Sequence, residues 1–351
     1  MSGRIRIGLI APPWVPVPPP SYGGTETMLD SLARALVRAG HEVVLFTTGD
    51  STCPVERRFE LPEAETHRMG VAVPELRHVM AAYEALRDVD IIHDHTIIGP
   101  VYSQLVDSPP VVTTNHGPFN DELRAVYRRV AEKVPLIAIS RHQASTAGDV
   151  PVAAVIHHGV DPESFEVGDG SGDDQGEYFL FLGRMAEEKG AARAAEIARR
   201  AGVRLIIAAK MREPWEVAYF NEKVAPLLDD RIVFVGEVGF EEKVRLLGGA
   251  RALLNPIRWP EPFGMVMVEA MACGTPVLAF PEGAASEIVE DRVTGFLCRD
   301  EDEMARRLSD VPEIDRQLCR SRVEKHFSSD RMAEDHLRLY RRVLEERVRL
   351  A

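Results

Sequence analysis

The chain has 351 residues, of which 45% are hydrophobic and 28% are charged, and its formal net charge is −13. This length is too great for one ordinary core and is typical of two domains, and the composition is that of a soluble globular protein. The acidic balance argues against a nucleic-acid partner, because such binding depends on cations that neutralise phosphates.

The N-terminal segment predicts a strand rather than a targeting signal. Residues 5–10 form a short apolar strand, and the residues before it contain no apolar segment with a cleavage site. No apolar run approaches the ~20 residues needed to cross a bilayer. We therefore expect a cytoplasmic protein.

Strands alternate with helices through the first half, which predicts βαβ units and a parallel sheet. A proline-rich loop follows the first strand and ends at Gly23-Gly24. The next segment carries apolar residues at helical spacing and stops at Gly40, as a helix does. The further strands expected in this half are 41–46, 90–93, 111–114, 136–139 and 153–156.

A polar, glycine-rich segment, residues 168–176, then interrupts the alternation and has the composition of a linker or an exposed loop. After it, the pattern predicts a helix over 191–201 and strands over 178–182, 203–207, 231–235, 252–254 and 275–279. A charged amphipathic helix over about 329–350 ends the chain. We expect an α/β protein of two doubly wound domains, 1–165 and 177–328, which face each other across a ligand cleft.

Two carboxylates in the C-terminal third attract attention. Glu261 lies in a loop flanked by proline, whereas Glu269 lies inside an apolar helix that ought to be buried. A charge in a core is costly unless it meets a partner. Glu269 is therefore the strongest single pointer to a ligand.

A turn between a strand and a helix, Gly183-Arg184 to Lys189-Gly190, is suited to phosphate. Such a turn directs backbone N–H groups and the positive end of a helix at an anion. Arg184 can fork onto phosphate oxygens, and Lys189 can add a point charge. By itself the turn is interpreted equally well as an ordinary loop with surface cations.

Gly23 and Gly24 open the first helix and allow the backbone to approach a ligand without a Cβ in between. The segment contains neither a G-x-G-x-x-G fingerprint nor a Walker loop. Six prolines between Pro12 and Pro20 are expected to stiffen a loop that lines the cleft. A polyproline recognition segment is the alternative.

Three further groups have plainer interpretations. His93 and His95 form an H-x-H pair without a third ligand nearby, so no metal site is expected. The spacing of the four cysteines indicates neither a zinc site nor a disulfide framework. A basic group on one predicted helix is diluted by acidic neighbours, so we expect a solvated face and no peripheral membrane contact. The basic residues are Arg124, Arg128, Arg129 and Lys133.

Taken together, these motifs resemble the retaining nucleotide-sugar glycosyltransferases of family four, which have the two-domain GT-B fold. The resemblance covers nearly the whole chain, and the order of the motifs makes it specific. The matching motifs are Gly23-Gly24-Thr25-Glu26, Gly183-Arg184 with Lys189-Gly190, Glu261 and Glu269 followed by Ala-Met-Ala-Cys-Gly-Thr-Pro-Val277, Ala284-Ala-Ser-Glu287 and Thr294-Gly-Phe296. Gly283-Ala284-Ala285 departs from the two adjacent glycines that are frequent in the family.

The resemblance implies roles for individual residues. Arg184 and Lys189 would hold the donor diphosphate, and Glu269 would accept hydrogen bonds from the ribose hydroxyls. Glu261 would grip the donor sugar, and His116 would line the sugar pocket near the reacting centre. The remaining implied donor-binding residues are Gly23, Gly24, Gly183, Phe263, Gly264 and Met265, and those implied in catalysis are His116, Arg184, Lys189 and Glu261.

On the acceptor side, His95 and Asn115 follow strands of the first half, and Trp14 and Tyr22 could stack on a sugar or an aromatic acceptor. Packing alone explains the two aromatic residues equally well. The acceptor itself and the oligomeric state stay open.

The reaction implied is hexosyl transfer from a nucleoside diphosphate sugar, with a UDP-sugar favoured over a GDP-sugar, to a small hydroxyl or glycan acceptor. Attack from the front face, with the leaving phosphate taking the proton, would retain the configuration. No metal or cofactor is expected, because the two cations and a helix N-terminus would stabilise the phosphate charge. The C-terminal helix, 329–351, would pack back towards the first domain. The length resembles bacterial members that act on small metabolites.

Two alternative functions use the same fold. One is a nucleotide-sugar epimerase or a sugar phosphorylase, although no cofactor lysine or free-phosphate site is identifiable for the latter. The other is a non-catalytic nucleotide-binding protein, which would tolerate loss of Glu261 or Arg184.

Overall fold

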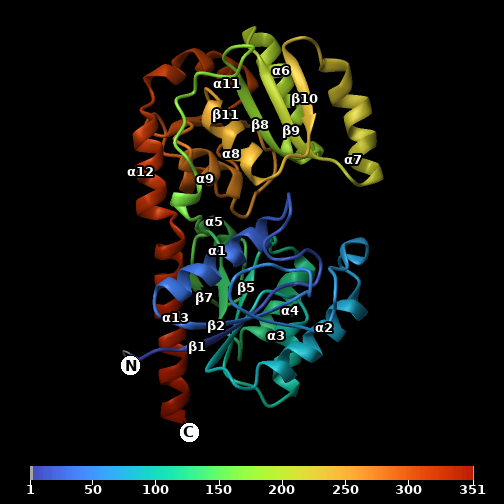
Figure 1. The fold of residues 1–351 in the computed structure, drawn as a ribbon, viewed down its shortest axis with the longest axis vertical. Helices are drawn as coiled ribbons and strands as arrows, with labels where there is room; N and C mark the ends of the chain where they lie inside the picture. Colours follow the sequence, from blue (N-terminus) through green and yellow to red (C-terminus); the bar gives the residue numbers. More distant parts are fainter. Residues whose placement is uncertain (1–2, 351) are drawn as a thin grey trace. The chain divides into compact units, whose positions relative to one another are not determined.

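The computed structural model describes residues 3–350, so residues 1–2 and 351, at the outer ends of the expected domains, lie outside the described part. The chain forms two compact units. The first comprises Met1–Gly159 and Ser329–Ala351, and the second comprises Val160–Ser328. In Figure 1 the red C-terminal helix accordingly runs beside the blue and green elements of the first unit.

The first unit contains a parallel sheet of seven strands in the order β3-β2-β1-β4-β5-β6-β7. In chain order these strands are β1 (Arg6–Ile10), β2 (Glu42–Thr47), β3 (Glu56–Phe59), β4 (Ile91–Asp94), β5 (Val111–Asn115), β6 (Leu136–Ala138) and β7 (Val152–Val155). The strand order reverses between β1 and β4. The loops at the carboxyl ends of these two strands therefore flank a topological switch point, where α/β proteins bind ligands.

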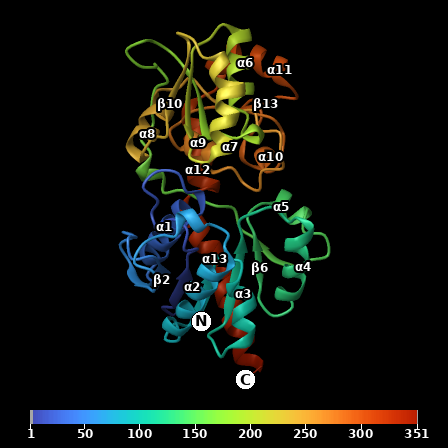
Figure 2. The same ribbon diagram turned by 90° about the vertical axis from the view of Figure 1, so that its right-hand side faces the viewer.

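Helices cover both faces of this sheet, as expected for a doubly wound fold. They are α1 (Gly24–Arg38), α2 (Ala72–Ala85), α3 (Gly99–Tyr102), α4 (Asp121–Val130), α5 (Arg141–Ser145) and α13 (Ser329–Leu350). α1 and α13 lie on one face, and α2, α3 and α4 lie on the other (Figure 1). Figure 2 shows α4 and α5 beside β6.

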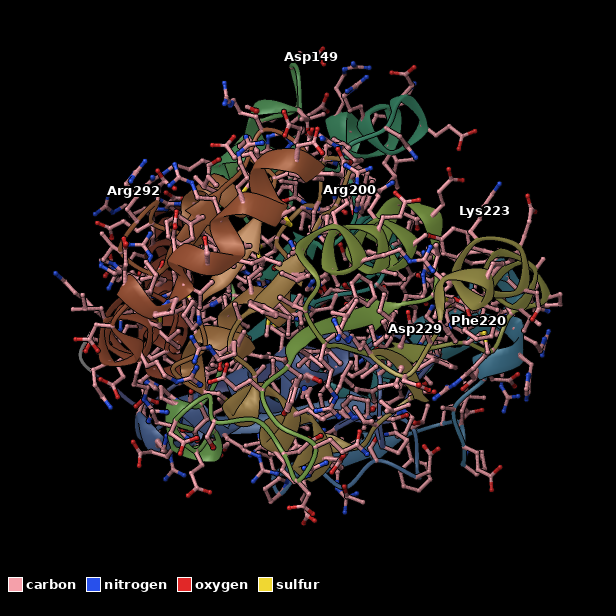
Figure 3. All side chains as sticks on the ribbon, turned by 90° about the horizontal axis from the view of Figure 1, so that it is seen from above. Asp149, Arg200, Phe220, Lys223, Asp229 and Arg292 are labelled. Atoms are coloured by element: carbon pink, nitrogen blue, oxygen red, sulfur yellow. The ribbon has the colours of Figure 1, made fainter. Side chains whose placement is uncertain are left out.

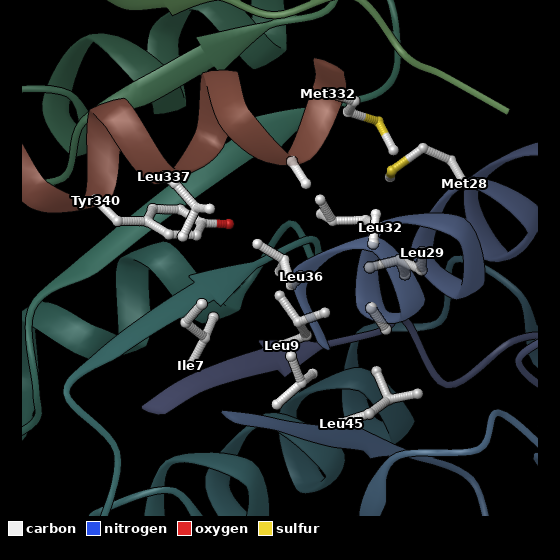
Figure 4. Close-up of a cluster of buried hydrophobic side chains, with 14 of the residues drawn as sticks. Ile7, Leu9, Met28, Leu29, Leu32, Leu36, Leu45, Met332, Leu337 and Tyr340 are labelled. Atoms are coloured by element: carbon white, nitrogen blue, oxygen red, sulfur yellow. The ribbon is translucent and has the colours of Figure 1, made fainter. Parts of the chain in front are cut away.

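One buried cluster joins α1, α13 and the central strands. Ile7 and Leu9 of β1 point into it, whereas Ile10 points to the opposite face, because successive strand residues alternate between faces. The residues through which the two helices meet are Met28, Leu32 and Leu36 of α1 and Met332, Leu337 and Tyr340 of α13 (Figure 4). The predicted return of the C-terminal helix to the first unit is confirmed.

The second unit contains a parallel sheet of six strands in the order β10-β9-β8-β11-β12-β13. In chain order they are β8 (Phe179–Arg184), β9 (Leu205–Lys210), β10 (Ile232–Gly236), β11 (Leu253–Asn255), β12 (Val277–Ala279) and β13 (Gly295–Leu297). Its α-helices are α6 (Ala191–Ala201), α7 (Pro214–Tyr219), α8 (Phe240–Gly249), α9 (Met265–Ala272), α10 (Ala285–Ile288), α11 (Glu301–Arg307) and α12 (Arg316–His326). The sheet order again reverses, between β8 and β11.

Charged side chains cover the outside of both units (Figure 3). In the second unit, Arg200 of α6 pairs with Asp302 of α11 at 2.6 Å. In the first unit, Arg128 of α4 pairs with Asp149 at 2.7 Å, and both side chains are at least half exposed. This basic helix therefore has the solvated, partly paired face expected from the sequence. The four cysteines are all buried and unpaired.

The boundary between the units differs from the expected one. It lies between Gly159 and Val160, so residues 160–165 belong to the second unit and not to the first. The glycine-rich segment is not the linker. Its Gly168 donates a backbone hydrogen bond to the Cys273 carbonyl at 3.1 Å, and a Cβ on Gly168 would lie 2.1 Å from the carbonyl oxygen of Gly248. Glycine is needed here for close packing of the backbone rather than for flexibility.

Candidate donor and acceptor sites

The strand-to-helix turn after β8 is built around Arg184 and Gly190. Arg184 is the last residue of β8, and a short 3-10 turn, η4 (Glu187–Lys189), precedes α6. Gly190 has φ of 87°, and a Cβ there would lie 2.5 Å from the carbonyl oxygen of Pro256. Both the left-handed backbone and the close contact require glycine. The turn therefore holds Lys189 in a fixed place directly before a helix N-terminus.

Lys189 and Glu261, predicted from segments far apart in the chain, are in direct contact. The Lys189 ammonium forms an ion pair with Glu261, and both side chains are about 15% exposed. Trp259 donates its indole N–H to the same carboxylate at 2.6 Å, and the ammonium lies 5.2 Å from the centre of the indole ring. We call these three side chains, of Lys189, Glu261 and Trp259, the Lys189 cluster.

Arg184 lies beside two carboxylates, Glu188 and Glu216, which the sequence did not indicate as its partners. Its guanidinium contacts Glu188 at 3.0 Å and approaches the fully buried Glu216 to 3.7 Å. Its Nε atom is buried and makes no hydrogen bond within the described residues. Burial raises the pKa of Glu216, but the Arg212 and Glu213 amides and Lys210 outweigh it, so the pKa of Glu216 stays below its ordinary value.

Glu269 is buried in α9, as predicted, but it has a partner within the chain. Its Oε1 atom lies 2.6 Å from the ammonium of Lys243 on α8, and the two side chains are 8% and 16% exposed. This ion pair compensates the burial of the carboxylate. Lys243 could not be predicted as this partner, because a contact between residues 26 positions apart has no local signature in the sequence.

The loop between Glu261 and α9 brings backbone amides together. Phe263 is buried, and Gly264 adopts φ of 96° directly before Met265, where α9 begins. The first amides of an α-helix have no partner inside the helix. The loop can therefore present these amides to hydroxyl or phosphate oxygens, next to Glu261. Gly183, expected from the sequence in the turn before α6, lies instead inside β8.

The backbone at Gly283 and Ala284 packs closely against the backbone of Glu261. The amide of Ala284 donates to the carbonyl of Glu261 at 3.0 Å. Gly283 has φ of 58°, and a Cβ there would lie 2.2 Å from the same carbonyl oxygen. Gly283 alone thus allows the close approach to the backbone of Glu261. The family that the sequence resembles often has two adjacent glycines here.

Replacing Gly283 by alanine is expected to lower the free energy of unfolding by about 2–4 kcal/mol, because left-handed strain adds to a backbone clash. Gly202→Ala is the matched control, since Gly202 has φ of 66° and open space around its Cβ position. Urea unfolding of both variants measures the effect. Equal behaviour of the two variants would contradict the supporting role.

In the first unit, Gly23 and Gly24 have different surroundings. A Cβ on Gly23 would lie 2.8 Å from Pro19 and 2.9 Å from the Glu26 carboxylate, whereas Gly24 has open space. A side chain would therefore clash at Gly23, whereas the space beside the backbone of Gly24 is open. Burial raises the pKa of Glu26 to about 7, and no other described residue gives its carboxyl a hydrogen bond or an ion pair.

The aromatic acceptor-side candidates separate on exposure. Trp14 is buried, and its carbonyl accepts a hydrogen bond from Thr66 at 2.8 Å, so the residue packs within the loop. Tyr22 is 44% exposed, at the start of the Gly23-Gly24 segment. Of the two, only Tyr22 offers its ring to a ligand.

His95, Asn115 and His116, predicted separately, lie together at the carboxyl ends of β4 and β5. His95 Nδ1 lies 2.9 Å from His116 Nε2, and His116 Nδ1 lies 3.4 Å from His158 Nε2. The Nε2 atom of His95 and the Nδ2 atom of Asn115 are buried without a hydrogen-bond partner in the described chain. Two unsatisfied polar atoms on neighbouring strands are unusual in a protein interior.

The histidine contacts continue beyond His95 as a row of neighbouring imidazole rings. The ring of His93 lies 4.0 Å from that of His95 and 5.0 Å from that of His336 on α13. We call the five residues the histidine row: His336, His93, His95, His116 and His158. His93, His95 and His116 were indicated by the sequence, but His336, which is distant from them in sequence, was not.

Comparison with known proteins places both units in one enzyme family. The family model described as glycosyltransferase family 4 matches residues 22–164, and the model described as glycosyl transferases group 1 matches residues 176–312. Together the two matches cover well over half of the chain. The chain belongs to glycosyltransferase family 4.

Its relatives agree with this assignment. Phosphatidyl-myo-inositol mannosyltransferase of Mycolicibacterium smegmatis is 29% identical, over 89% of this chain and 86% of the relative. AviGT4, a glycosyltransferase involved in avilamycin A biosynthesis, is 27% identical with a TM-score of 0.73, over 97% of this chain and 98% of that one. The structure of Anabaena HepE in complex with UDP and glucose shares the fold, with 18% identity, a TM-score of 0.74 and coverage of 96% and 99%.

This family 4 protein is therefore a glycosyltransferase with the GT-B fold, as the sequence resemblance implied. Within residues 3–350, no group of three or more His, Cys, Asp or Glu side chains is arranged to hold a metal ion. No helix in the same range is long and apolar enough to span a bilayer.

The histidine row makes the stability of this glycosyltransferase sensitive to acid. Burial lowers the pKa of His336 to about 4, and burial together with neighbouring imidazoles holds the pKa of His93 and His95 well below its ordinary value. An unfolded imidazole binds its proton near pH 6.5, so between about pH 6.5 and pH 4 the unfolded state binds more protons. Stability contributed by the row is complete above this window and falls as the pH falls through it.

For His336 alone this loss amounts to about 3 kcal/mol across the window. Chemical unfolding of the wild type and of His336→Gln at pH 4 to 8 tests it, because glutamine does not titrate. The stability difference between the two proteins should shrink as the pH falls. A difference that is independent of pH would contradict the burial of a neutral imidazole.

Proposed function

We propose that this enzyme transfers a hexose from a nucleoside diphosphate sugar, with UDP as the favoured nucleotide, to a hydroxyl group of a small or glycan acceptor, with retention of the anomeric configuration and without a metal ion. The observation that carries the proposal is the Lys189 cluster. It joins a cation, a carboxylate and an indole N–H beside the amides that open α9.

Each part of this site matches one part of such a donor. Lys189 and Arg184 supply positive charge for the diphosphate, and charge develops there as the nucleotide leaves. Glu261 and the amides around Gly264 supply acceptors and donors for sugar hydroxyls. Glu269 supplies a carboxylate for the ribose, with Lys243 holding it in place.

The ion pair between Lys189 and Glu261 has a mechanistic consequence for this proposal. In the ligand-free enzyme the two charges compensate each other. When a diphosphate binds, the ammonium can turn part of its hydrogen bonding to phosphate oxygens, and the carboxylate becomes available to sugar hydroxyls. The pair would therefore keep both groups in place before the donor arrives, which lowers the entropic cost of binding.

On the first unit, we assign Gly24 to the donor diphosphate and His116 to the sugar. The acceptor hydroxyl is assigned to the surroundings of His95 and Asn115. Two buried polar atoms without partners there support this choice, because a polyol supplies both donors and acceptors. Loss of the proton to the leaving phosphate completes the front-face transfer: the new glycosidic bond forms as the bond to the phosphate oxygen breaks.

A thermal-shift panel of UDP, GDP, ADP and their sugar conjugates tests the nucleotide. A ligand at one hundred times its Kd stabilises the protein by about 2.7 kcal/mol. We expect the largest shift with UDP or a UDP-sugar. NMR of the product anomeric proton then tests retention, and activity in the presence of EDTA tests metal independence. A GDP-only response, inversion, or loss of activity with EDTA would each overturn the corresponding part.

A further inference from the structure

The histidine row begins at a fixed point on the C-terminal helix. His336 Nδ1 lies 2.8 Å from the carbonyl oxygen of Met332, and a carbonyl only accepts hydrogen bonds, so this nitrogen carries the proton. Four residues further along the same face of α13, Tyr340 places its hydroxyl 2.7 Å from His93 Nδ1. Helix α13 thus supplies one member of the row, His336, and one further side chain in contact with it, Tyr340.

His93 connects α13 to β5 and to His95. Its second nitrogen, Nε2, lies 2.7 Å from the hydroxyl of Thr114. Thr114 belongs to β5 and precedes His116 by two residues. The ring of His93 also packs against that of His95, with 4.0 Å between the centres and an angle of 41° between the planes. Because both nitrogens are engaged and the residue is fully buried, the ring of His93 has one orientation.

The Nε2 atom of His95, which has no hydrogen-bond partner in the described chain, indicates which nitrogen carries the proton in His95 and in His116. If His95 carried its proton on Nε2, that N–H would be buried without an acceptor. The proton therefore belongs on Nδ1, from which it is donated to His116 Nε2 at 2.9 Å. A neutral His116 must then carry its own proton on Nδ1, which points to His158 Nε2 at 3.4 Å.

We propose that Tyr340 and His336 are positioning residues for His116: through His93 and His95 they fix its ring orientation and keep its proton on Nδ1. The inference rests on the proposed role of His116 at the donor sugar. It gives the C-terminal helix a part in the site that none of the sequence motifs includes. The rings remain neutral at neutral pH, since burial lowers the pKa of His95 and His116.

Tyr340→Phe is the most direct test, because it removes only the hydroxyl that holds His93. Full-length protein labelled with ¹⁵N-histidine reports the proton-bearing nitrogen of each ring, and His116→Gln identifies the signals of His116. We expect the Nδ1–H form of His116 to give way to a mixture of tautomers. We expect kcat to fall roughly fivefold, the effect of one neutral hydrogen bond, with the donor KM unchanged. His336→Gln should act in the same direction.

Tyr127→Phe is the matched control. Tyr127 is as deeply buried in the first unit, but it belongs to the cluster on the other face of the sheet. It should leave the histidine signals and kcat unchanged. If Tyr340→Phe lowers the melting temperature but leaves the His116 signals as in the wild type, its role is merely structural and the proposal fails. If the signals change while kcat does not, the positioning stands and the role of His116 in turnover fails.

Discussion

Lys189→Ala is expected to lower kcat by about 10²–10³-fold, the loss typical of removing one preorganised group that stabilises developing charge. The variant should remain folded, because the side chain is partly exposed and its removal leaves Glu261 bonded to Trp259 at 2.6 Å. Steady-state assays with the donor identified by the nucleotide panel measure the effect.

The control for this prediction is Lys223→Ala. Lys223 is an exposed lysine of the same unit, paired with its neighbour Glu222 at 2.9 Å, and surface pairs of this kind contribute little. Its loss should leave kcat unchanged. A decrease of less than about fivefold for Lys189→Ala would contradict a role in phosphate stabilisation and reduce the Lys189 cluster to a structural feature.

Glu269→Ala is expected to weaken nucleotide affinity by about 10–100-fold, whichever base is bound, because hydrogen bonds to a charged group are worth about 1.5–3 kcal/mol. The change also leaves the ammonium of Lys243 nearly buried and unpaired, so the protein should lose stability. Isothermal titration with UDP and with GDP measures the first effect, and urea unfolding measures the second.

Two further variants separate these effects. Glu269→Ala combined with Lys243→Met should recover stability but not nucleotide affinity, since the stranded charge is gone and the carboxylate is still absent. His116→Ala should do the opposite of Glu269→Ala: it should spare nucleotide affinity and depress turnover. Equal losses of nucleotide affinity in His116→Ala and Glu269→Ala would overturn the assignment of one residue to the ribose and the other to the sugar.

The helices with strong periodic patterns could be predicted closely from the sequence. The expected helices over 191–201 and 329–350 coincide with α6 and α13. β3 escaped prediction because its residues, Glu56–Phe59, are mostly exposed and polar, as an edge strand allows. β13 escaped because one of its three residues, Gly295–Leu297, is a glycine, a residue that is depleted in strands.

The candidate site could likewise be predicted only in part: its residues could be, but their contacts could not. Motif residues such as Lys189 and Glu261 were predicted individually, because a glycine follows the first and prolines flank the second in the sequence. Their contact with each other, and the pairing of Glu269 with Lys243, depend on how separate loops and helices pack. Tertiary contacts of this kind have no counterpart in the sequence spacing.

The position of α13 also determines when the enzyme can complete its folding during synthesis. Residues 160–328 form one continuous unit, but the first unit needs Met332, Leu337 and Tyr340, which leave the ribosome after the whole second unit. Until then, α1 packs on the sheet without its contacts to α13. The usual order, in which the N-terminal domain folds first, is thus reversed for the final step. A premature stop after residue 328 would release a chain with an intact second unit and an incomplete first one.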